Sequence, residues 1–288
     1  RSNRIRSVHA STAIEGNTLT LAQVEGLALG EPVFAAPREV REVANALAAY
    51  DALEKFDPWN VDDFLRAHGM LTAGLVMESG EFRTVDVEIV NAEGDVLHSG
   101  SRVQKVPRLV RELLEWGSAA NDHPLVVSSA VHFLIEHIHP FRDGNGRIGR
   151  LWQTLVLSKW RSVFAWMPTE TIIRQNQHGY YMSLQESREP EIDAAPFIDF
   201  MLDVIGESLR VYEVQASETA ENVGINVGIN DMILDLLRLD PTMSAAALAA
   251  HLGKTPRTVE RYLASMRETG QIVREGSRKS GRWIVVEG

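Results

Sequence analysis

The chain has 288 residues, a formal net charge of −10 and no cysteine. A chain without cysteine cannot form disulfides, thiolate zinc sites or iron–sulfur clusters, and it has no cysteine nucleophile. It is compatible with a reducing cytoplasm, which is the compartment that we expect. No apolar run approaches the roughly 20 residues that span a bilayer, so we expect no membrane segment. The negative charge argues against a general coating of nucleic acid.

Charge is unevenly distributed along the chain. From Asn226 onward nine Lys and Arg residues stand against seven Asp and Glu, whereas the remainder carries 20 against 32. An acidic body with a mildly basic tail predicts two domains with different partners. We place these domains at residues 1–216 and 230–288. The predicted linker, residues 217–229, is polar and contains two glycines.

Most of the body has the three- and four-residue apolar spacing of helices. Helices are predicted over residues 38–56, 61–75, 106–116, 125–138, 147–160, 170–185 and 194–212. Residues 82–90 alternate instead, and the turn residues that follow predict a β-hairpin running to residue 98. The expected fold is therefore mainly α, a helical bundle with one β-hairpin.

The tail has a different pattern. Helices are predicted over residues 232–239 and 244–252, the second capped by Ser244 and ended by Gly253. A third helix starts at Thr255 with a proline in its first turn, and residues 271–286 alternate around a Gly-rich turn. This is the element order of a small winged helix-turn-helix domain, and the sequence LAAHLGKTPRTVERYL resembles that family.

Three basic residues of the tail are candidates for contact with DNA. Lys254, Arg257 and Arg261 fall on one face of the predicted third helix, where they could touch phosphates. A net charge of +2 from Asn226 onward is small for a DNA-binding domain. No Asn or Gln that could read a base shares that face. A DNA-binding transcriptional regulator and a protein-interaction or dimerisation module therefore both stay open.

The stretch HPFRDGNGRIGR, residues 139–150, carries the most chemistry. A histidine able to accept a proton near neutral pH ends an apolar helix. An aspartate, a type of Mg²⁺ ligand, follows four residues later. Two glycines let backbone N–H groups approach a phosphate at the start of the next helix. Two arginines on that helix can fork onto phosphate oxygens, so the stretch predicts a polyphosphate cradle with a base.

Other interpretations of this stretch are weaker. Residues 144–149 also match the G-x-G-x-x-G dinucleotide pattern, but that pattern requires a preceding strand and the preceding segment has helical period. The nearby histidines lack the His-x-x-x-His spacing of zinc helices. No Walker A pattern occurs in the chain.

Residues 139–150 fit the Fic signature H-x-F-x-[D/E]-G-N-G-R-x-x-R at every fixed position, and the chain resembles that family over roughly residues 1–215. Fic proteins are helical and mostly transfer AMP from ATP to a hydroxyl of a target protein. The resemblance implies that His139 deprotonates a target Ser, Thr or Tyr and that Asp143 binds Mg²⁺. It also implies that Arg147 holds the β-phosphate and Arg150 the γ-phosphate. Gly144, Asn145 and Gly146 would cradle the phosphates.

The resemblance extends to the nucleotide. Doc-type relatives, which phosphorylate, carry Lys where this chain has Gly146, so the intact glycine favours AMP transfer. UTP stays open as another substrate because the base pocket is not part of the signature. Tyr180 and Tyr181 resemble tyrosines that lie near the nucleobase in the family, although one of them can equally belong to the core.

The predicted hairpin, residues 82–98, resembles the flap of Fic proteins. An extended target segment can pair with the edge of such a flap through main-chain hydrogen bonds. Val87 and Ile89 are the candidates to clamp that segment. Their face could equally pack onto the helices, because alternation does not say which face is free.

Residues 11–17, STAIEGN, resemble the Fic inhibitory motif, which begins here with Ser11. The resemblance implies that Glu15 pairs with Arg150 and displaces the γ-phosphate of ATP. The alternative is a helix that simply ends at Gly16. Removal of AMP from a modified target, with Glu15 orienting a water, is the other chemical interpretation. A second copy of the chain is a further candidate partner.

Overall fold

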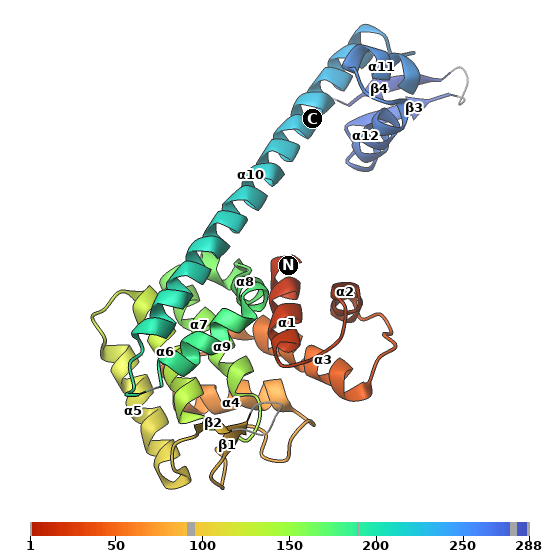
Figure 1. Ribbon diagram of the computed structural model, residues 1–288. Helices are drawn as coiled ribbons and strands as arrows, with labels where there is room; N and C mark the ends of the chain where they lie inside the picture. The colour runs from red at the N-terminus through yellow and green to blue at the C-terminus, as the bar shows by residue number, and fades with distance from the viewer. Residues whose placement is uncertain (1, 91–95, 189, 277–280, 287–288) are drawn as a thin grey trace. The chain divides into compact units, whose positions relative to one another are not determined.

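The computed structural model describes residues 2–90, 96–188, 190–276 and 281–286. It divides into two compact units, Arg1–Tyr212 and Glu213–Gly288, and its described residues are mainly helical (Figure 1). The helices of the first unit are α1 (Ser2–Ile14), α2 (Leu21–Leu29), α3 (Pro37–Asp51), α4 (Val61–Thr72), α5 (Val106–Ala119), α6 (Pro124–Ile138), α7 (Asn145–Trp160), α8 (Thr169–Gln175) and α9 (Gln177–Glu186). Helix α10 (Ala195–Leu239) begins in the first unit and ends in the second. Within the described residues, no helix combines the length and the apolarity needed to cross a membrane.

Helices α6 and α7 form the centre of the first unit. Most side chains of α7 are buried, and Trp152 at its middle is fully enclosed. The Trp152 indole donates a hydrogen bond to the Pro58 carbonyl at 2.9 Å and meets the ring of Phe64 edge-on. Truncating such a buried tryptophan to alanine costs about 3–5 kcal/mol. The core therefore fixes α7, and with it the loop that precedes α7.

The predicted helices are largely confirmed, but α3 ends at Asp51 and α4 at Thr72, before the predicted ends at residues 56 and 75. The helix expected over residues 170–185 is interrupted at Asn176, which has φ −112° and ψ 35° and separates α8 from α9. Helix α10 continues past residue 212, through the predicted linker, to Leu239. Along the chain, the boundary of the two compact units falls between Tyr212 and Glu213. The predicted domain bounds, 1–216 and 230–288, stay a prediction.

Helix α2 was not predicted, although its start carries a local signal. Thr20 accepts a hydrogen bond from the backbone N–H of Gln23, and the Gln23 side chain accepts one from the backbone N–H of Thr20. This reciprocal pair is a capping box, which satisfies two N–H groups at the helix start. Gly30 ends the helix in the left-handed conformation with φ 79°.

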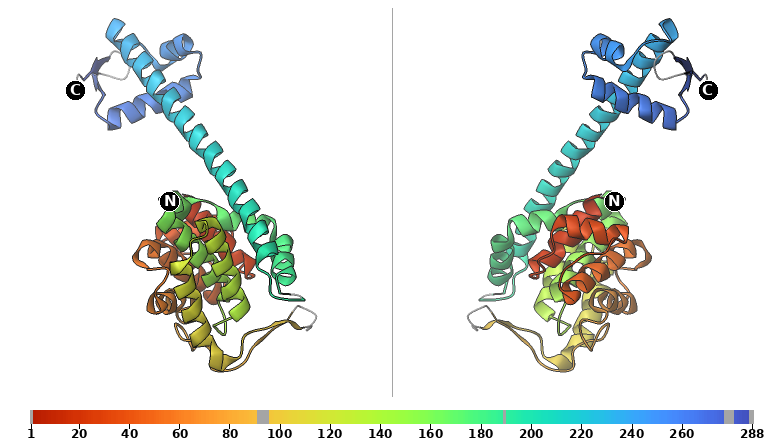
Figure 2. Two further views of the ribbon diagram at one scale, coloured as in Figure 1. Left: turned by 90° about the vertical axis from the view of Figure 1, so that its left-hand side faces the viewer. Right: turned by 90° about the vertical axis from the view of Figure 1, so that its right-hand side faces the viewer.

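The predicted hairpin is present, but its first strand is shorter than predicted. Strands β1 (Glu88–Val90) and β2 (Val96–Ser99) pair antiparallel, with Glu88 opposite Ser99, and protrude from the helices of the first unit (Figure 2). Residues 82–87 are not strand. The reason is Arg83, whose buried side chain donates to the Val85 carbonyl and keeps this segment against the helices.

The second unit has the predicted winged-helix order. After the end of α10 come α11 (Ala245–Leu252), α12 (Pro256–Glu268), β3 (Ile272–Glu275) and β4 (Arg282–Val285). The predicted caps are confirmed, since Ser244 accepts from Ala247 N at 3.1 Å and Gly253 has φ 62°. The core of this unit consists of Ile233, Leu237, Leu248, Ala249, Val259, Leu263, Met266, Ile272 and Trp283.

Candidate active site

The loop between α6 and α7 holds His139 in an unusual conformation. His139 ends α6 with φ 53° and ψ 62°, and it is the one non-glycine residue with positive φ in the described part of the chain. A left-handed conformation costs an L-residue roughly 1–2 kcal/mol, so other contacts must stabilise it. The His139 N–H still donates to the Ile135 carbonyl at 2.9 Å, which ties the residue to the end of α6.

Arg83 supplies the main contact to the backbone of His139. Its Nε donates to the His139 carbonyl at 2.8 Å, and its two terminal nitrogens donate to the carbonyls of Val85, at 2.6 Å, and Ser101. Val85 precedes the hairpin and Ser101 follows it. The buried guanidinium thus joins both ends of the hairpin to the predicted base. Arg83 was not predicted from the sequence, because a single Arg before a strand has no spacing signal.

The ring of His139 is half-buried, and its Nδ1 lies 3.4 Å from the Glu136 carbonyl. When Nδ1 donates to this carbonyl, the lone pair is on Nε2, which can then accept a proton. The structure therefore gives His139 a fixed backbone and a contact that favours the tautomer with its lone pair on Nε2.

The glycine-rich segment is closed by Asn145. Its Oδ1 accepts from Phe141 N at 2.9 Å and its Nδ2 donates to Phe141 O at 2.8 Å. The side chain predicted to cradle phosphate is thus committed to holding the loop. Gly144 is the N-cap of α7 with φ 86°, a conformation that glycine adopts without strain. Among the residues that the structure describes, no side chain caps this helix, so its first backbone N–H groups are available to an anion.

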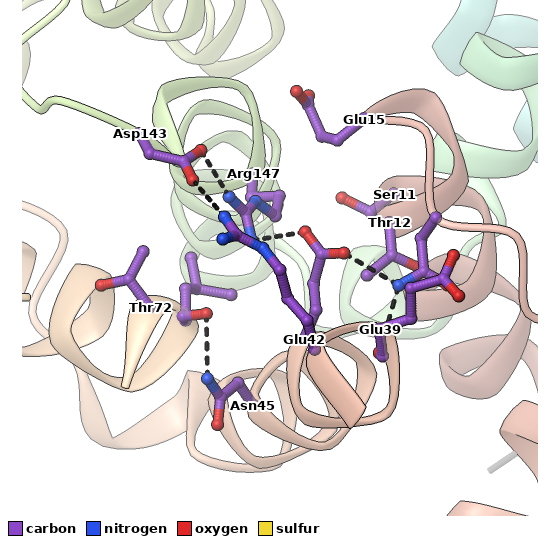
Figure 3. Close-up of polar contacts among 12 residues, drawn as sticks. Ser11, Thr12, Glu15, Glu39, Glu42, Asn45, Thr72, Asp143 and Arg147 are labelled. Atoms are coloured by element: carbon purple, nitrogen blue, oxygen red, sulfur yellow. Dashed lines mark hydrogen bonds and ion pairs between the residues drawn. The ribbon is translucent and has the colours of Figure 1, made fainter. Parts of the chain in front are cut away.

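Arg147 lies between two carboxylates (Figure 3). Its side chain is 4% exposed, with NH2 2.8 Å from the Asp143 carboxylate and NH1 2.6 Å from Glu42 Oε1. The contact with Glu42 is an ion pair rather than an aligned hydrogen bond, since NH1 has no hydrogen-bond partner among the described residues. Arg147 Nε is also buried without a hydrogen bond in this part of the chain. The predicted β-phosphate residue therefore retains donors that a phosphate could use.

Arg150 is fully buried and is bound by helix α1 and the residue that follows it. Its NH2 lies 2.7 Å from Glu15 Oε1 and donates to the Ser11 carbonyl at 3.0 Å, while Nε donates to Ser11 Oγ at 3.1 Å. The ion pair expected between Glu15 and Arg150 is thus present. Burial acts to lower the pKa of Arg150, but the acidic groups around it, first among them the Glu15 carboxylate, together outweigh burial and hold that pKa above its ordinary value.

Gly146 makes room for the Glu15 carboxylate. A Cβ added at Gly146 would overlap Glu15 Oε1 and would lie 3.0 Å from Arg150 NH1. Any other residue at this position would push Glu15 away from Arg150. The ion pair of Glu15 with Arg150 therefore requires a glycine at position 146.

A polar pocket of about 250 Å³ opens beside Arg147. The charged side chains around it are Glu15, Arg38, Glu39, Glu42, Asp143 and Arg147. Four carboxylates against two guanidiniums give it a formal charge of −2. Arg38 and Glu42 were not predicted from the sequence, because both lie far from the signature in the chain and their spacing gives no signal.

The two neighbouring tyrosines have different environments. Tyr180 is 1% exposed, and its hydroxyl lies 3.1 Å from His132 Nε2 and 3.4 Å from Glu136 Oε1. Tyr181 is 47% exposed, with its hydroxyl 3.5 Å from the Ile14 carbonyl. Tyr180 is therefore the core residue of the pair. Tyr181 is the exposed residue of the pair, and the nucleobase role of either tyrosine stays a prediction.

The remaining predicted residues lie on the hairpin and in the tail. Val87 is half-buried and faces Gly100, close to the backbone that carries His139. The backbone of Ile89 pairs with His98, and its side chain lies outside the described part of the structure. Lys254, Arg257 and Arg261 are exposed at the start of α12 and along it. Their proposed contacts stay predictions.

The geometry of this site and the fold around it correspond to known proteins. Residues 55–157 match the Fic/DOC family, and residues 232–273 match the winged helix-turn-helix DNA-binding family. A crystal structure of a Fic family protein from Desulfovibrio desulfuricans G20 is 38% identical, with a TM-score of 0.73. That match covers 100% of this chain and 87% of the other. The chain belongs to the Fic family.

More distant relatives carry a functional name. The protein adenylyltransferase Fic of Culex quinquefasciatus is 29% identical over 76% of this chain and 43% of its own length. That of Aedes aegypti is 29% identical over 76% of this chain and 44% of its own. The chain thus spans less than half the length of these curated relatives. Fic-1 of C. elegans, residues 134–508, has a TM-score of 0.60 and 25% identity, covering 75% of this chain and 64% of that structure.

Proposed function

We propose that the chain transfers AMP from ATP to a hydroxyl of a target protein and releases pyrophosphate. The observation that carries this proposal is the arrangement of one loop and one helix start. His139 ends α6, and Asp143, Arg147 and Arg150 follow at the beginning of α7. The proposed base and phosphate ligands thus lie on one loop and on the first turns of the helix that follows it. The relatives named protein adenylyltransferase Fic support the same activity.

The phosphates of ATP would bind at the start of α7. Its uncapped N–H groups and positive helix end favour an anion there. Arg147 Nε and Arg150 NH1 are buried donors without a hydrogen bond, and a buried unpaired donor gains from a charged acceptor. Arg147 would hold the β-phosphate and Arg150 the γ-phosphate. Tyr181 would lie near the base.

Asp143 fits a magnesium ligand. Its carboxylate is 40% exposed and lines the polar pocket beside Arg147. No cluster of three or more His, Asp or Glu that could hold a metal occurs within the described residues. One carboxylate is nevertheless enough when substrate phosphates supply other ligands, as is common for Mg²⁺. When bound, the ion supplies positive charge that offsets the charge of the phosphates.

His139 would act as the base for the target hydroxyl. Its Nε2 accepts the hydroxyl proton, while the hydroxyl oxygen bonds to the α-phosphorus. The bond between the α-phosphorus and the bridging oxygen breaks, and pyrophosphate leaves with that electron pair. Strands β1 and β2 offer an edge for an extended target segment, and Arg83 connects this hairpin to His139.

Glu15 would inhibit this reaction. Its carboxylate occupies Arg150, the residue that would hold the γ-phosphate, and adds a negative charge to a pocket that is already acidic. Two like charges about 4 Å apart repel by roughly 4 kcal/mol at an effective dielectric near 20, before screening. ATP would therefore bind weakly, or with its γ-phosphate displaced, while Glu15 stays in place.

Label transfer from nucleotides to protein tests the proposal. The parent chain, Glu15→Gly and the Glu15→Gly, His139→Ala double variant would be incubated with labelled ATP, UTP or GTP and a cell lysate. We expect Glu15→Gly to raise AMP transfer by about tenfold or more, because relief of even a quarter of that repulsion is several-fold in affinity and realignment of the α-phosphate adds to it. His139→Ala should erase the gain, since loss of a general base costs about 10²–10⁴-fold.

Two results would contradict the proposal. Transfer that survives His139→Ala would exclude the base, and equal labelling by the parent chain and Glu15→Gly would exclude the inhibition. If Glu15→Gly instead lost an ability to strip AMP from modified protein, the chain would catalyse the reverse reaction.

DNA binding by the second unit is a separate candidate function. The match of residues 232–273 to a DNA-binding family favours it, and Arg257 and Arg261 are exposed on α12, with Lys254 exposed just before that helix. A salt-dependent shift on duplex DNA would test it, because phosphate contacts weaken as salt rises.

A further inference from the structure

Glu42 has two partners that belong to different parts of the chain. One oxygen, Oε1, lies 2.6 Å from Arg147 NH1, and the other, Oε2, accepts a hydrogen bond from Asn17 Nδ2 at 2.8 Å. The side chain is only 16% exposed, so water competes little for either oxygen. Figure 3 shows its carboxylate turned toward Arg147 from α3. The Glu42 carboxylate thus links Arg147, which would hold the β-phosphate, to the segment that follows α1.

Asn17 anchors the turn that carries Glu15. Its amide nitrogen also donates to the Glu39 carbonyl at 3.1 Å, and its Oδ1 accepts from Leu19 N at 3.1 Å. The backbone N–H of Asn17 donates to the Thr12 carbonyl, the same carbonyl that accepts from Glu15 N. Asn17 is therefore bonded to α3 through its side chain and to the end of α1 through its backbone.

Glu15 itself has less to hold it. Its side chain is 30% exposed, and its contact with Arg150 must compete with the γ-phosphate in the proposed mechanism. The next residue is Gly16 with φ 91°, a conformation that glycine enters and leaves easily. The position of Glu15 therefore depends on the anchor at Asn17, which lies two residues further along the chain.

We infer that Glu42 is a positioning residue of the phosphate site, acting on Arg147 directly and on Glu15 through Asn17. The inference rests on the proposed AMP transfer and its inhibition. The first contact of Glu42, which we call the arm to Arg147, supports catalysis: when Asp143 binds a metal, Glu42 still pairs with the buried guanidinium of Arg147. The second contact, the arm to Asn17, supports inhibition, because it keeps Glu15 opposite Arg150.

The two arms can be separated chemically. A carboxylate accepts at both oxygens, whereas a glutamine has one acceptor oxygen and a donating NH₂ group. Glu42→Gln therefore cannot serve Arg147 and Asn17 together. Asn17→Ala removes the second arm and leaves the ion pair with Arg147 in place. Each arm then has its own variant, and Glu15→Gly supplies a background in which inhibition no longer contributes.

AMP transfer by Asn17→Ala and Glu42→Gln would be measured in the full chain, each with and without Glu15→Gly. We expect Asn17→Ala alone to raise transfer by about threefold or more, as loss of one hydrogen bond of typical strength would. In the Glu15→Gly background it should change transfer by less than about twofold, because the arm has nothing left to position. Glu42→Gln in that background should raise the KM for ATP by about fivefold or more while kcat changes less.

Asn45→Ala is the matched control for Asn17. Asn45 is also an amide on this part of the fold, on α3, and it donates to the carbonyls of Leu71 and Ala73 rather than to either arm. Glu112→Gln makes the same chemical change as Glu42→Gln in an exposed ion pair with Arg108. Both controls should leave transfer within about twofold of their parent, as is usual for exposed pairs and sites without shared partners.

The outcomes separate the inference from the proposed function. If Glu15→Gly does not raise transfer, the proposed inhibition is wrong. If Glu15→Gly raises transfer and Asn17→Ala does not, the proposed action of Glu42 on Glu15 through Asn17 is overturned. An unchanged KM for ATP in the Glu15→Gly, Glu42→Gln variant overturns the arm to Arg147. Asn17→Ser, with a shorter polar side chain, gives a second test of the contact between Asn17 and Glu42 should Asn17→Ala fold poorly.

Discussion

The carboxylate of Asp143 lies 2.8 Å from the guanidinium of Arg147, four residues along the chain. The proposed metal ligand is thus already engaged by the proposed β-phosphate ligand. For ATP to bind as proposed, magnesium would replace Arg147 as the partner of Asp143, and the phosphates would replace Asp143 as the partner of Arg147. Asp143 is 40% exposed and can turn away, whereas Arg147 is enclosed.

The first prediction concerns this carboxylate. Asp143→Asn should raise the Mg²⁺ concentration needed for half-maximal AMP transfer by about tenfold or more, since a neutral amide is a weaker ligand for a hard cation. The titration would be carried out in the Glu15→Gly background, where the rate is measurable. An unchanged magnesium dependence would remove Asp143 from the metal site.

Arg150→Ala should lower AMP transfer, although it also removes the partner of Glu15. Hydrogen bonds to charged groups contribute about 1.5–3 kcal/mol, so loss of the γ-phosphate contact should weaken ATP binding by about tenfold or more. Relief of inhibition acts in the opposite direction but cannot replace that contact. The measurement is the rate at rising ATP concentration. A higher rate than the parent at saturating ATP would mean that Arg150 serves inhibition more than binding.

Arg83→Met should lower AMP transfer while leaving ATP affinity nearly unchanged. The variant keeps an unbranched apolar stem but loses the donors to His139, Val85 and Ser101, so the left-handed conformation of His139 is no longer stabilised. We expect transfer in the Glu15→Gly background to fall by about tenfold or more, as small misplacements of a catalytic group can cost this much.

ATP binding measured by calorimetry is the control for Arg83→Met, because no phosphate ligand is altered. If ATP affinity and transfer fall in parallel, Arg83 supports the fold of the whole site rather than the position of His139. Transfer equal to that of the parent would show that α6 alone holds the histidine.

Much of the site could be predicted because its signals are local. The signature of residues 139–150 is contiguous, and the ion pair of Glu15 with Arg150 followed from two motifs together. Glu42 and Arg83 could not be found in this way. Each acts on a residue distant in the chain, and a lone Glu on a helix or a lone Arg before a strand looks like any surface charge.

The fold was predictable to the same extent and for the same reason. Caps such as Ser244 and Gly253 are read from one or two residues, and both are confirmed. The interruption at Asn176 and the short strand β1 were not predicted. The strand is short because Arg83 binds the carbonyls around it, a tertiary contact that overrides the alternation of residues 82–90.

The second unit permits a separate prediction. Arg257→Ala should weaken binding to duplex DNA of random sequence and reduce the slope of log affinity against log salt by about 0.9, the value for one lost phosphate contact. Arg257 is exposed in the first turn of α12, so its removal should not disturb the core of this unit. Fluorescence anisotropy over a range of salt concentrations measures both quantities. Binding that does not depend on Arg257 would move the contact elsewhere or exclude DNA as the partner.

The last prediction concerns stability and pH. His132 is completely buried, with Nδ1 2.7 Å from Gln153 Oε1 and Nε2 3.1 Å from the Tyr180 hydroxyl. Burial, reinforced by the positive charge of Arg150, lowers the pKa of His132 from 6.5 to about 3, although the bond to Gln153 opposes this. The folded chain thus keeps this imidazole neutral where the unfolded chain protonates it.

The contribution of His132 to the free energy of unfolding should therefore be complete above about pH 6.5. It should fall as the pH drops toward 3, since the unfolded state then binds a proton that the folded state does not. Between about pH 7 and about pH 5 the loss is on the order of 2 kcal/mol. Burial raises the pKa of the neighbouring Glu136, which acts in the opposite direction, so the parent alone does not isolate the effect. Comparison with His132→Gln does, because an amide keeps a donor and an acceptor but does not titrate. Urea unfolding of the unit Arg1–Tyr212, followed in the full chain at both pH values, should show a smaller loss in the variant. An equal loss in parent and variant would mean that His132 is protonated in the folded protein.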